Sequence, residues 1–129
     1  MIRIYPAIFE NDPVGLGVEF PDVENAVTQG KDVAEALENA SDVLGIQLSW
    51  NIENDIPLPE PTPINDIEFD PATQFISLVQ VDLSDYLKDT KADKKTVKIP
   101  HWLNVKAEKE GINFSRTLTE ALYDKVGIN

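Results

Sequence analysis

The chain of 129 residues has no cysteine and a single histidine, His101. Without cysteine there can be no disulfide, no thiolate metal ligand and no cysteine–histidine catalytic pair. A serine–histidine–aspartate triad would have to use His101, and a metal sensor would need a cluster of histidines and cysteines. We therefore expect a protein that is not an enzyme, with no cofactor and no metal; for His101 we expect a solvent-facing position near DNA or a dimer surface.

Long apolar runs are also missing. No stretch reaches the roughly 18 apolar residues that a membrane-spanning helix needs. The first residues, Met1-Ile2-Arg3-Ile4-Tyr5-Pro6, lack the basic region, apolar core and cleavage site of a signal peptide. These absences indicate a cytoplasmic protein with no membrane partner.

Basic residues are scarce in the first two thirds of the chain. The net charge is −12, but residues 1–87 hold two Lys/Arg against 17 Asp/Glu, whereas residues 88–129 hold nine against six. Such asymmetry between halves suggests two surfaces with different partners. We expect a first domain at 1–88, a hinge at 89–93 and a second domain at 94–129.

The first domain shows alternating strand patterns and one helical pattern, which together predict an α+β fold in the order β-β-β-α-β. The helix begins after Asp32, an N-cap with Glu35 three residues later, and its apolar stripe indicates packing on a sheet. The predicted strands cover residues 2–9, 15–20, 26–29 and 75–81.

Particular residues of this domain lead to further expectations. Pro6 indicates an edge position or a bulge in the first strand, and Gly15 and Gly17 permit close approach of another backbone to the second. Residues 75–81 are apolar on both faces, which favours a central strand. Trp50 should close the core beneath the helix.

The tail reads as a strand at 94–99, a helix from Pro100 to about residue 110, and a second helix that ends at Gly127. Gly111 is typical of a left-handed helix stop and Asn113 of an N-cap. A lone strand has no partner within this segment, so a second copy of the chain should pair with it. This order predicts a ribbon-helix-helix homodimer, whose ribbon enters the DNA major groove; larger assemblies stay open.

The predicted DNA and dimer contacts follow from this arrangement. The outward side chains Lys94, Thr96 and Lys98 should contact bases. The free N–H groups and positive dipole at the start of the second helix should bind phosphate. The expected phosphate contacts are Lys95, Asn113, Phe114, Ser115 and Arg116, and the expected dimer core is Val97, Ile99, Trp102, Leu103, Phe114, Leu118 and Leu122.

The chain also resembles HicB-type antitoxins along nearly its whole length. The resemblance rests on Tyr5-Pro6-Ala7-Ile8-Phe9, Phe20-Pro21-Asp22, Thr28-Gln29-Gly30, residues 35–40, Pro59-Glu60-Pro61, and in the tail Ile99-Pro100, Trp102-Leu103 and residues 111–115 and 120–122. One departure is Glu24-Asn25-Ala26, where the family often has a turn like Pro-Gly-Cys.

The resemblance implies a truncated ribonuclease-H-like first domain that binds a small basic toxin ribonuclease of the HicA type. It also implies that the second domain represses the shared operon by binding operator DNA. The candidate toxin-binding residues are the acidic side chains Glu10, Glu19, Asp22 and Glu24.

Two other functions remain open from the residues alone. One is a ribbon-helix-helix repressor whose first domain senses a small apolar or amino-acid ligand. The other is a residual nuclease, because Glu10, Glu19 and Asp22 lie near strand ends and metal-dependent nucleases bring several carboxylates together.

Overall fold

The computed structural model describes residues 1–87 and 92–127. The chain divides into two compact units, Met1–Asp89 and Thr90–Asn129. The division falls inside the segment 89–93 for which the sequence predicts a hinge, but residues 88–91 lie outside the described residues, so the hinge stays a prediction. Within the described ranges, no helix is both long and apolar enough to cross a bilayer.

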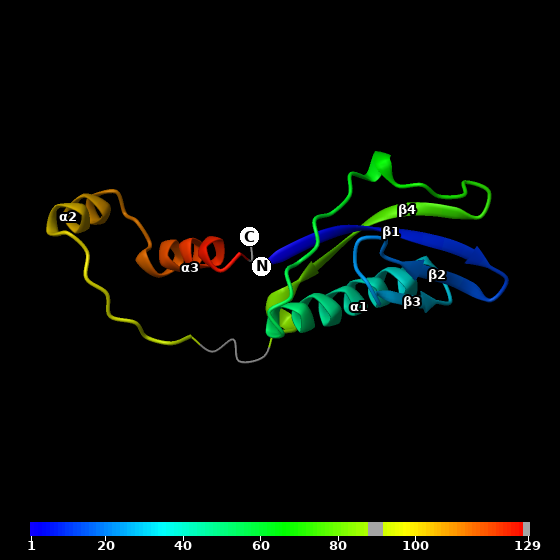
Figure 1. Cartoon of the computed structure of the whole chain (residues 1–129), viewed down its shortest axis with the longest axis horizontal. Helices are drawn as coiled ribbons and strands as arrows, with labels where there is room; N and C mark the ends of the chain where they lie inside the picture. Colours follow the sequence, from blue (N-terminus) through cyan, green and yellow to red (C-terminus); the bar gives the residue numbers. More distant parts are fainter. Residues whose placement is uncertain (88–91, 128–129) are drawn as a thin grey trace. The chain divides into compact units, whose positions relative to one another are not determined.

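The first unit is a four-stranded antiparallel sheet with one long helix against it (Figure 1). Its strands are β1 (Ile2–Asp12), β2 (Gly15–Glu19), β3 (Val27–Gly30) and β4 (Gln74–Asp82), and their order in the sheet is β3-β2-β1-β4. Each strand expected in this unit is present, with ends that differ by at most three residues. The α+β architecture is therefore confirmed.

Strand β4 lies at the edge of the sheet, so the expectation of a central strand is wrong. The alternation explains why: Val79 and Val81 are buried on one face, whereas Leu78 on the other face is 56% exposed. Pro6 agrees with its expected edge position. It pairs with Leu78 on one side, but β2 pairs only with residues 8–12 of β1, so no second strand needs the N–H that proline lacks.

Helix α1 (Val33–Glu53) begins as expected, since the Asp32 side chain accepts from the Glu35 backbone N–H at 2.9 Å. Its buried stripe has a spacing of four and consists of Ala36, Ala40, Leu44 and Leu48. Trp50 does not close the core: it is 52% exposed, because a residue two positions after Leu48 points to the opposite side of a helix. Val33 and Leu37, which are also apolar, are exposed.

Small residues let α1 approach the sheet. A Cβ on Gly30 would lie 2.4 Å from the backbone nitrogen of Ala36, so only glycine allows β3 to meet the helix there. On the face of the sheet that α1 covers, Phe9 and Phe75 stack with ring centroids 5.1 Å apart. Tyr5, Phe9, Leu44 and Leu48 are among the most deeply buried side chains of this core.

The turn before β3 forms despite its departure from the family pattern. Asn25 adopts the left-handed conformation with φ of 66°, a position that asparagine tolerates better than most residues. The Phe20 N–H donates to the Ala26 carbonyl at 3.1 Å and closes the loop. Asparagine thus takes the backbone role for which glycine is the usual residue.

A long connector joins α1 to β4 and includes the 3-10 helix η1 (Ile64–Asp66). The Tyr5 hydroxyl donates to the Pro59 carbonyl at 2.6 Å and ties this connector to β1. After β4, the 3-10 helix η2 (Leu83–Asp85) is capped by the side chain of Asp82. The Tyr86 hydroxyl then donates to Asp42 on α1 at 2.9 Å.

The second unit contains α2 (His101–Lys109) and α3 (Phe114–Lys125). Asn113 caps α3 as expected, accepting from the Arg116 backbone N–H at 3.1 Å, and Gly111 has the expected left-handed φ of 67°. Helix α2 starts one residue after Pro100. Residues 94–99 form no strand within the single chain, because no other described segment pairs with them.

Candidate functional site

The face of the sheet opposite α1 combines exposed apolar and acidic side chains. Side chains alternate along a strand, so Tyr5, Ala7 and Phe9 face the core and the even-numbered residues of β1 face away from it. We call this second surface the open face and define it by Ile4, Ile8, Glu10, Glu19, Val27, Ile76 and Leu78.

Three large apolar side chains of the open face are exposed: Ile4 at 45%, Leu78 at 56% and Val27 at 63%. Several exposed apolar side chains on one face of a sheet, with acidic side chains among them, are typical of a site where another macromolecule binds. Sequence reasoning missed these residues. The apolar side chains on both faces of β4 could have identified Leu78, whereas Ile4 on β1 and Val27 on β3 carry no comparable signal.

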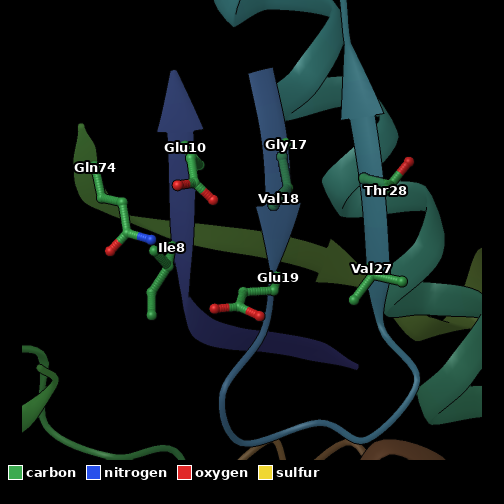
Figure 2. A pocket seen from close by; sticks show the side chains of 8 residues that line it. All are labelled: Ile8, Glu10, Gly17, Val18, Glu19, Val27, Thr28 and Gln74. Atoms are coloured by element: carbon green, nitrogen blue, oxygen red, sulfur yellow. The ribbon is translucent and has the colours of Figure 1, made fainter. Parts of the chain in front are cut away.

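The carboxylates of Glu10 and Glu19 lie on adjacent strands of the open face. In the pairing of β1 with β2, Glu10 stands opposite Gly17 and Ile8 stands opposite Glu19. The two glutamates are therefore diagonal neighbours, a relation that places residues roughly 7–8 Å apart. Figure 2 shows both side chains on the same side of the sheet, in front of the helix.

A hollow of about 210 Å³ opens between these glutamates, above Gly17. We call it the Gly17 hollow. Its other walls come from β1, β2, β3 and the start of β4, namely Ile8, Val18, Val27, Thr28 and Gln74 (Figure 2). A second hollow of about 470 Å³ starts at Glu10 and Gly17 and runs along the exposed turn between β1 and β2.

The side-chain carboxylates of Glu10 and Glu19 have no hydrogen-bond or ion-pair partner among residues 1–87 and 92–127. The first unit offers little positive charge to balance them. Lys31 lies 3.9 Å from Glu35 on α1, and the Nε atom of Arg3 is buried without a hydrogen-bond partner. The open face can therefore accept positive charge from a partner.

The other two candidate acids lie apart from the hollow. Asp22 accepts two hydrogen bonds from Thr62 of the connector, one from the backbone N–H at 2.8 Å and one from the hydroxyl at 2.5 Å. Glu24 is exposed on the loop between β2 and β3. The structure thus brings Glu10 and Glu19 together, engages Asp22 within the fold, and leaves Glu24 on a loop.

Within the described part of the chain, no group of three or more histidine, cysteine, aspartate or glutamate side chains is placed to hold a metal ion. Burial raises the pKa of the Tyr5 and Tyr86 phenols, and the hydrogen bond to Asp42 raises that of Tyr86 further. Hydrogen bonds from Ser84 lower the pKa of Asp82. All three side chains hold the fold together and lie away from the Gly17 hollow.

The second unit has apolar side chains but no core of its own. No residue from 92 to 127 is buried. The seven residues predicted for a dimer core are between 38% and 67% exposed, with Trp102 the most exposed. A unit of about 40 residues is at the lower limit of what folds alone without disulfides, metals or association.

The predicted DNA contacts are accessible in this unit. Lys94, Lys95, Thr96 and Lys98 are all exposed, as is His101 at the start of α2. Phe114 and Ser115 begin α3, where backbone N–H groups have no partner within the helix. The Arg116 guanidinium lies 3.2 Å from Glu120 one turn later, so phosphate would have to compete with that exposed carboxylate.

These features define a class: a small α+β binding domain with an acidic and apolar sheet face, followed by a helical unit that lacks its own core. The comparison with known families agrees. Residues 5–120 match the family described as the HicB-like antitoxin of bacterial toxin–antitoxin systems. The chain belongs to this family.

Three relatives illustrate the match. A chain from a toxin–antitoxin complex of Streptococcus pneumoniae is 38% identical, with a TM-score of 0.63 over 97% of this chain and 99% of that chain. The HicB antitoxin of Escherichia coli K12 is 39% identical over 62 residues, which are 47% of this chain and 45% of that protein. The crystal structure of antitoxin HicB3 is 23% identical with a TM-score of 0.62 over 95% of this chain and 97% of that chain, and supports the fold alone.

Proposed function

We propose that this protein is the antitoxin of a HicA/HicB-type pair and neutralises a small basic toxin ribonuclease by binding it on the open face. The observation that carries the proposal is the pair of unpartnered carboxylates, Glu10 and Glu19, set among exposed apolar side chains. Complementary charge speeds association and selects partners, while apolar contact supplies much of the affinity. The proposed role is binding and not catalysis.

The charge of the first unit supports a basic partner. Residues 1–87 carry 17 acidic and two basic side chains. A field of one sign attracts a partner of the opposite sign and repels nucleic acid. We therefore assign toxin binding to the first unit and DNA binding to the second. The likeness to a truncated ribonuclease-H-like domain belongs to the same proposal and is supported by the order β-β-β-α-β.

For the second unit we propose a ribbon-helix-helix homodimer. Residues 94–99 would pair with the same residues of a second copy, and the exposed apolar side chains of α2 and α3 would form the shared core. The exposure of Trp102, Leu103 and Phe114 supports this proposal, because these side chains gain most from a partner surface.

In such a dimer, the side chains of Lys94, Thr96 and Lys98 from both copies would enter the major groove. The start of α3, with Asn113 as its cap, would bind phosphate on either side of the ribbon. The second unit carries a net charge of only +3 over residues 88–129. Two copies, and neutralisation of the first units by a basic toxin, would strengthen operator binding.

Co-expression tests this function. The protein encoded beside this gene should arrest growth when it is produced alone, and growth should return when this chain is produced with it. The purified pair should form a complex whose association slows as salt concentration rises. Growth arrest that this chain does not relieve, or no complex at low salt, would contradict the proposed function.

A further inference from the structure

Gly17 lies in the middle of β2, where glycine is not required by the fold. Its backbone has no left-handed conformation, and a Cβ placed on it would meet no atom within 4 Å. The expectation of close backbone approach is therefore wrong at Gly17, whereas it is confirmed at Gly15, where a Cβ would lie 2.4 Å from the Gly30 carbonyl oxygen. Glycine in a strand interior loses conformational entropy and packs no side chain, and it often marks a point where another molecule approaches closely.

The walls around Gly17 have a combination of chemistry that suits one kind of side chain. Ile8 and Val27 are apolar, and Glu10 and Glu19 contribute two carboxylates on opposite sides (Figure 2). Arginine and lysine have an apolar stem and a cationic end, so they bury the stem while the charge meets a carboxylate. Small-molecule sites usually enclose about 300–1,000 Å³, and the Gly17 hollow is smaller, at about 210 Å³.

We propose that the Gly17 hollow receives a single cationic side chain, an arginine or a lysine, from the basic protein partner. The stem lies over Gly17, whose diagonal neighbours on the two adjacent strands are Ile8 and Val27. The cationic group lies between the carboxylates of Glu10 and Glu19. This inference rests on the proposed function, because it names the part of the open face that selects the toxin.

The test fills the hollow without changing charge. The full-length chain, as native protein and as the Gly17→Ala and Gly17→Val variants, is measured by biolayer interferometry. The probe is the purified product of the neighbouring toxin gene, inactivated at its catalytic residue. We expect Gly17→Val to raise Kd by about tenfold or more, mainly through a faster koff, because the charges that steer association stay in place. Gly17→Ala should give a smaller effect.

Charge variants give a different kinetic signature. Glu10→Gln and Glu19→Gln should lower kon and reduce its salt dependence. The matched control is Glu38→Gln. Glu38 is an exposed residue of α1, so this variant removes the same charge away from the hollow and should change neither kon nor koff. Thermal unfolding should place Gly17→Val at or above the native melting temperature, because valine favours a strand.

Partner substitution completes the test. Each arginine and lysine of the toxin is changed to alanine, and the effects are combined with Gly17→Val in double-mutant cycles. At one toxin position, the alanine variant should weaken binding as much as Gly17→Val does. Combining that variant with Gly17→Val should weaken binding no further. A native-like Kd for a folded Gly17→Val variant, or fully additive effects at every position, would overturn this inference and leave the proposed function standing. Absence of binding by the native chain would overturn both.

Discussion

The hydrogen bonds between Asp22 and Thr62 offer a prediction about stability that separates Asp22 from the toxin-binding acids. Asp22 lies on the loop between β2 and β3, and its carboxylate accepts from both the backbone N–H and the hydroxyl of Thr62, 40 residues away. Asp22→Ala removes both bonds and leaves the Thr62 N–H without its acceptor. The loop and the connector are then joined only through other contacts.

The magnitude follows from the burial of this carboxylate. Hydrogen bonds to charged groups contribute about 1.5–3 kcal/mol each when buried. Asp22 is only half-buried, so water replaces part of the hydrogen bonding that the variant loses. We therefore expect the free energy of unfolding to fall by about 2 kcal/mol when both bonds are removed. A domain of fewer than 100 residues shifts its melting temperature by about 4–8 °C per kcal/mol. Asp22→Ala should therefore melt about 10 °C below the native chain.

The assay is thermal unfolding of the full chain followed by circular dichroism. Glu24→Ala is the control, because Glu24 is exposed on the same loop and has no hydrogen bond among the described residues. Thr62→Val should reproduce about half of the effect, since it removes the hydroxyl and keeps the N–H. If Asp22→Ala melted within 2 °C of native protein, as Glu24→Ala should, the structural role of Asp22 would be refuted.

Three further predictions concern the tail and the connector. Lys98→Ala should weaken binding to a DNA fragment carrying the chain's own promoter by about 1–3 kcal/mol and relax specificity; an unchanged gel-shift midpoint would count against a base contact. Leu118→Lys should convert a dimer to a monomer in analytical ultracentrifugation, because a charge cannot be buried cheaply in a shared core; a native-like dimer would contradict that core. Burial raises the pKa of the Tyr5 phenol in the folded chain. The phenol's contribution to stability is therefore fully present below its pKa in the unfolded chain, about 10, and is lost as the pH rises through its higher pKa in the folded chain. Tyr5→Phe should reduce this alkaline loss and leave the part that comes from Tyr86, whose pKa is also raised; a loss of stability as large as in native protein would contradict the role of Tyr5.

Much of the fold follows from local signals in the sequence. The strands alternate clearly, and Asp32, Gly111 and Asn113 are cap residues whose chemistry acts within four residues. The division of charge at about residue 88 agrees with the division into two units. Each of these signals depends on neighbours in sequence, which is why they can be recognised without coordinates.

Most of the wrong expectations concern contacts between distant residues; Trp50 is an exception, because its exposure follows from its position around α1. Apolar residues on both faces of 75–81 favoured a central strand, but β4 is at the edge and leaves Leu78 exposed on the open face. The contact of Asp22 with Thr62 spans 40 residues and leaves no pattern in the sequence. Gly17 and Gly30 look alike in sequence, yet one faces a hollow and the other meets the backbone of α1.

The pairing of Glu10 with Glu19 could be anticipated in part. Both were candidates because they lie near strand ends, and the register of β1 with β2 makes them diagonal neighbours. The register depends on the length of the turn between the strands, which sequence alone does not set to a single residue. The same uncertainty hid Ile4, Val27 and Leu78, whose exposure becomes visible only when the strands are placed side by side.

Inhibition of the toxin by this chain tests the central claim most directly. The purified product of the neighbouring toxin gene should cleave RNA, and the native chain should stop cleavage at near-stoichiometric ratios. The double variant Glu10→Gln/Glu19→Gln should need about tenfold more protein for the same inhibition, with Glu38→Gln inhibiting like native protein. Equal inhibition by the double variant and the native chain would contradict the assignment of toxin binding to the open face.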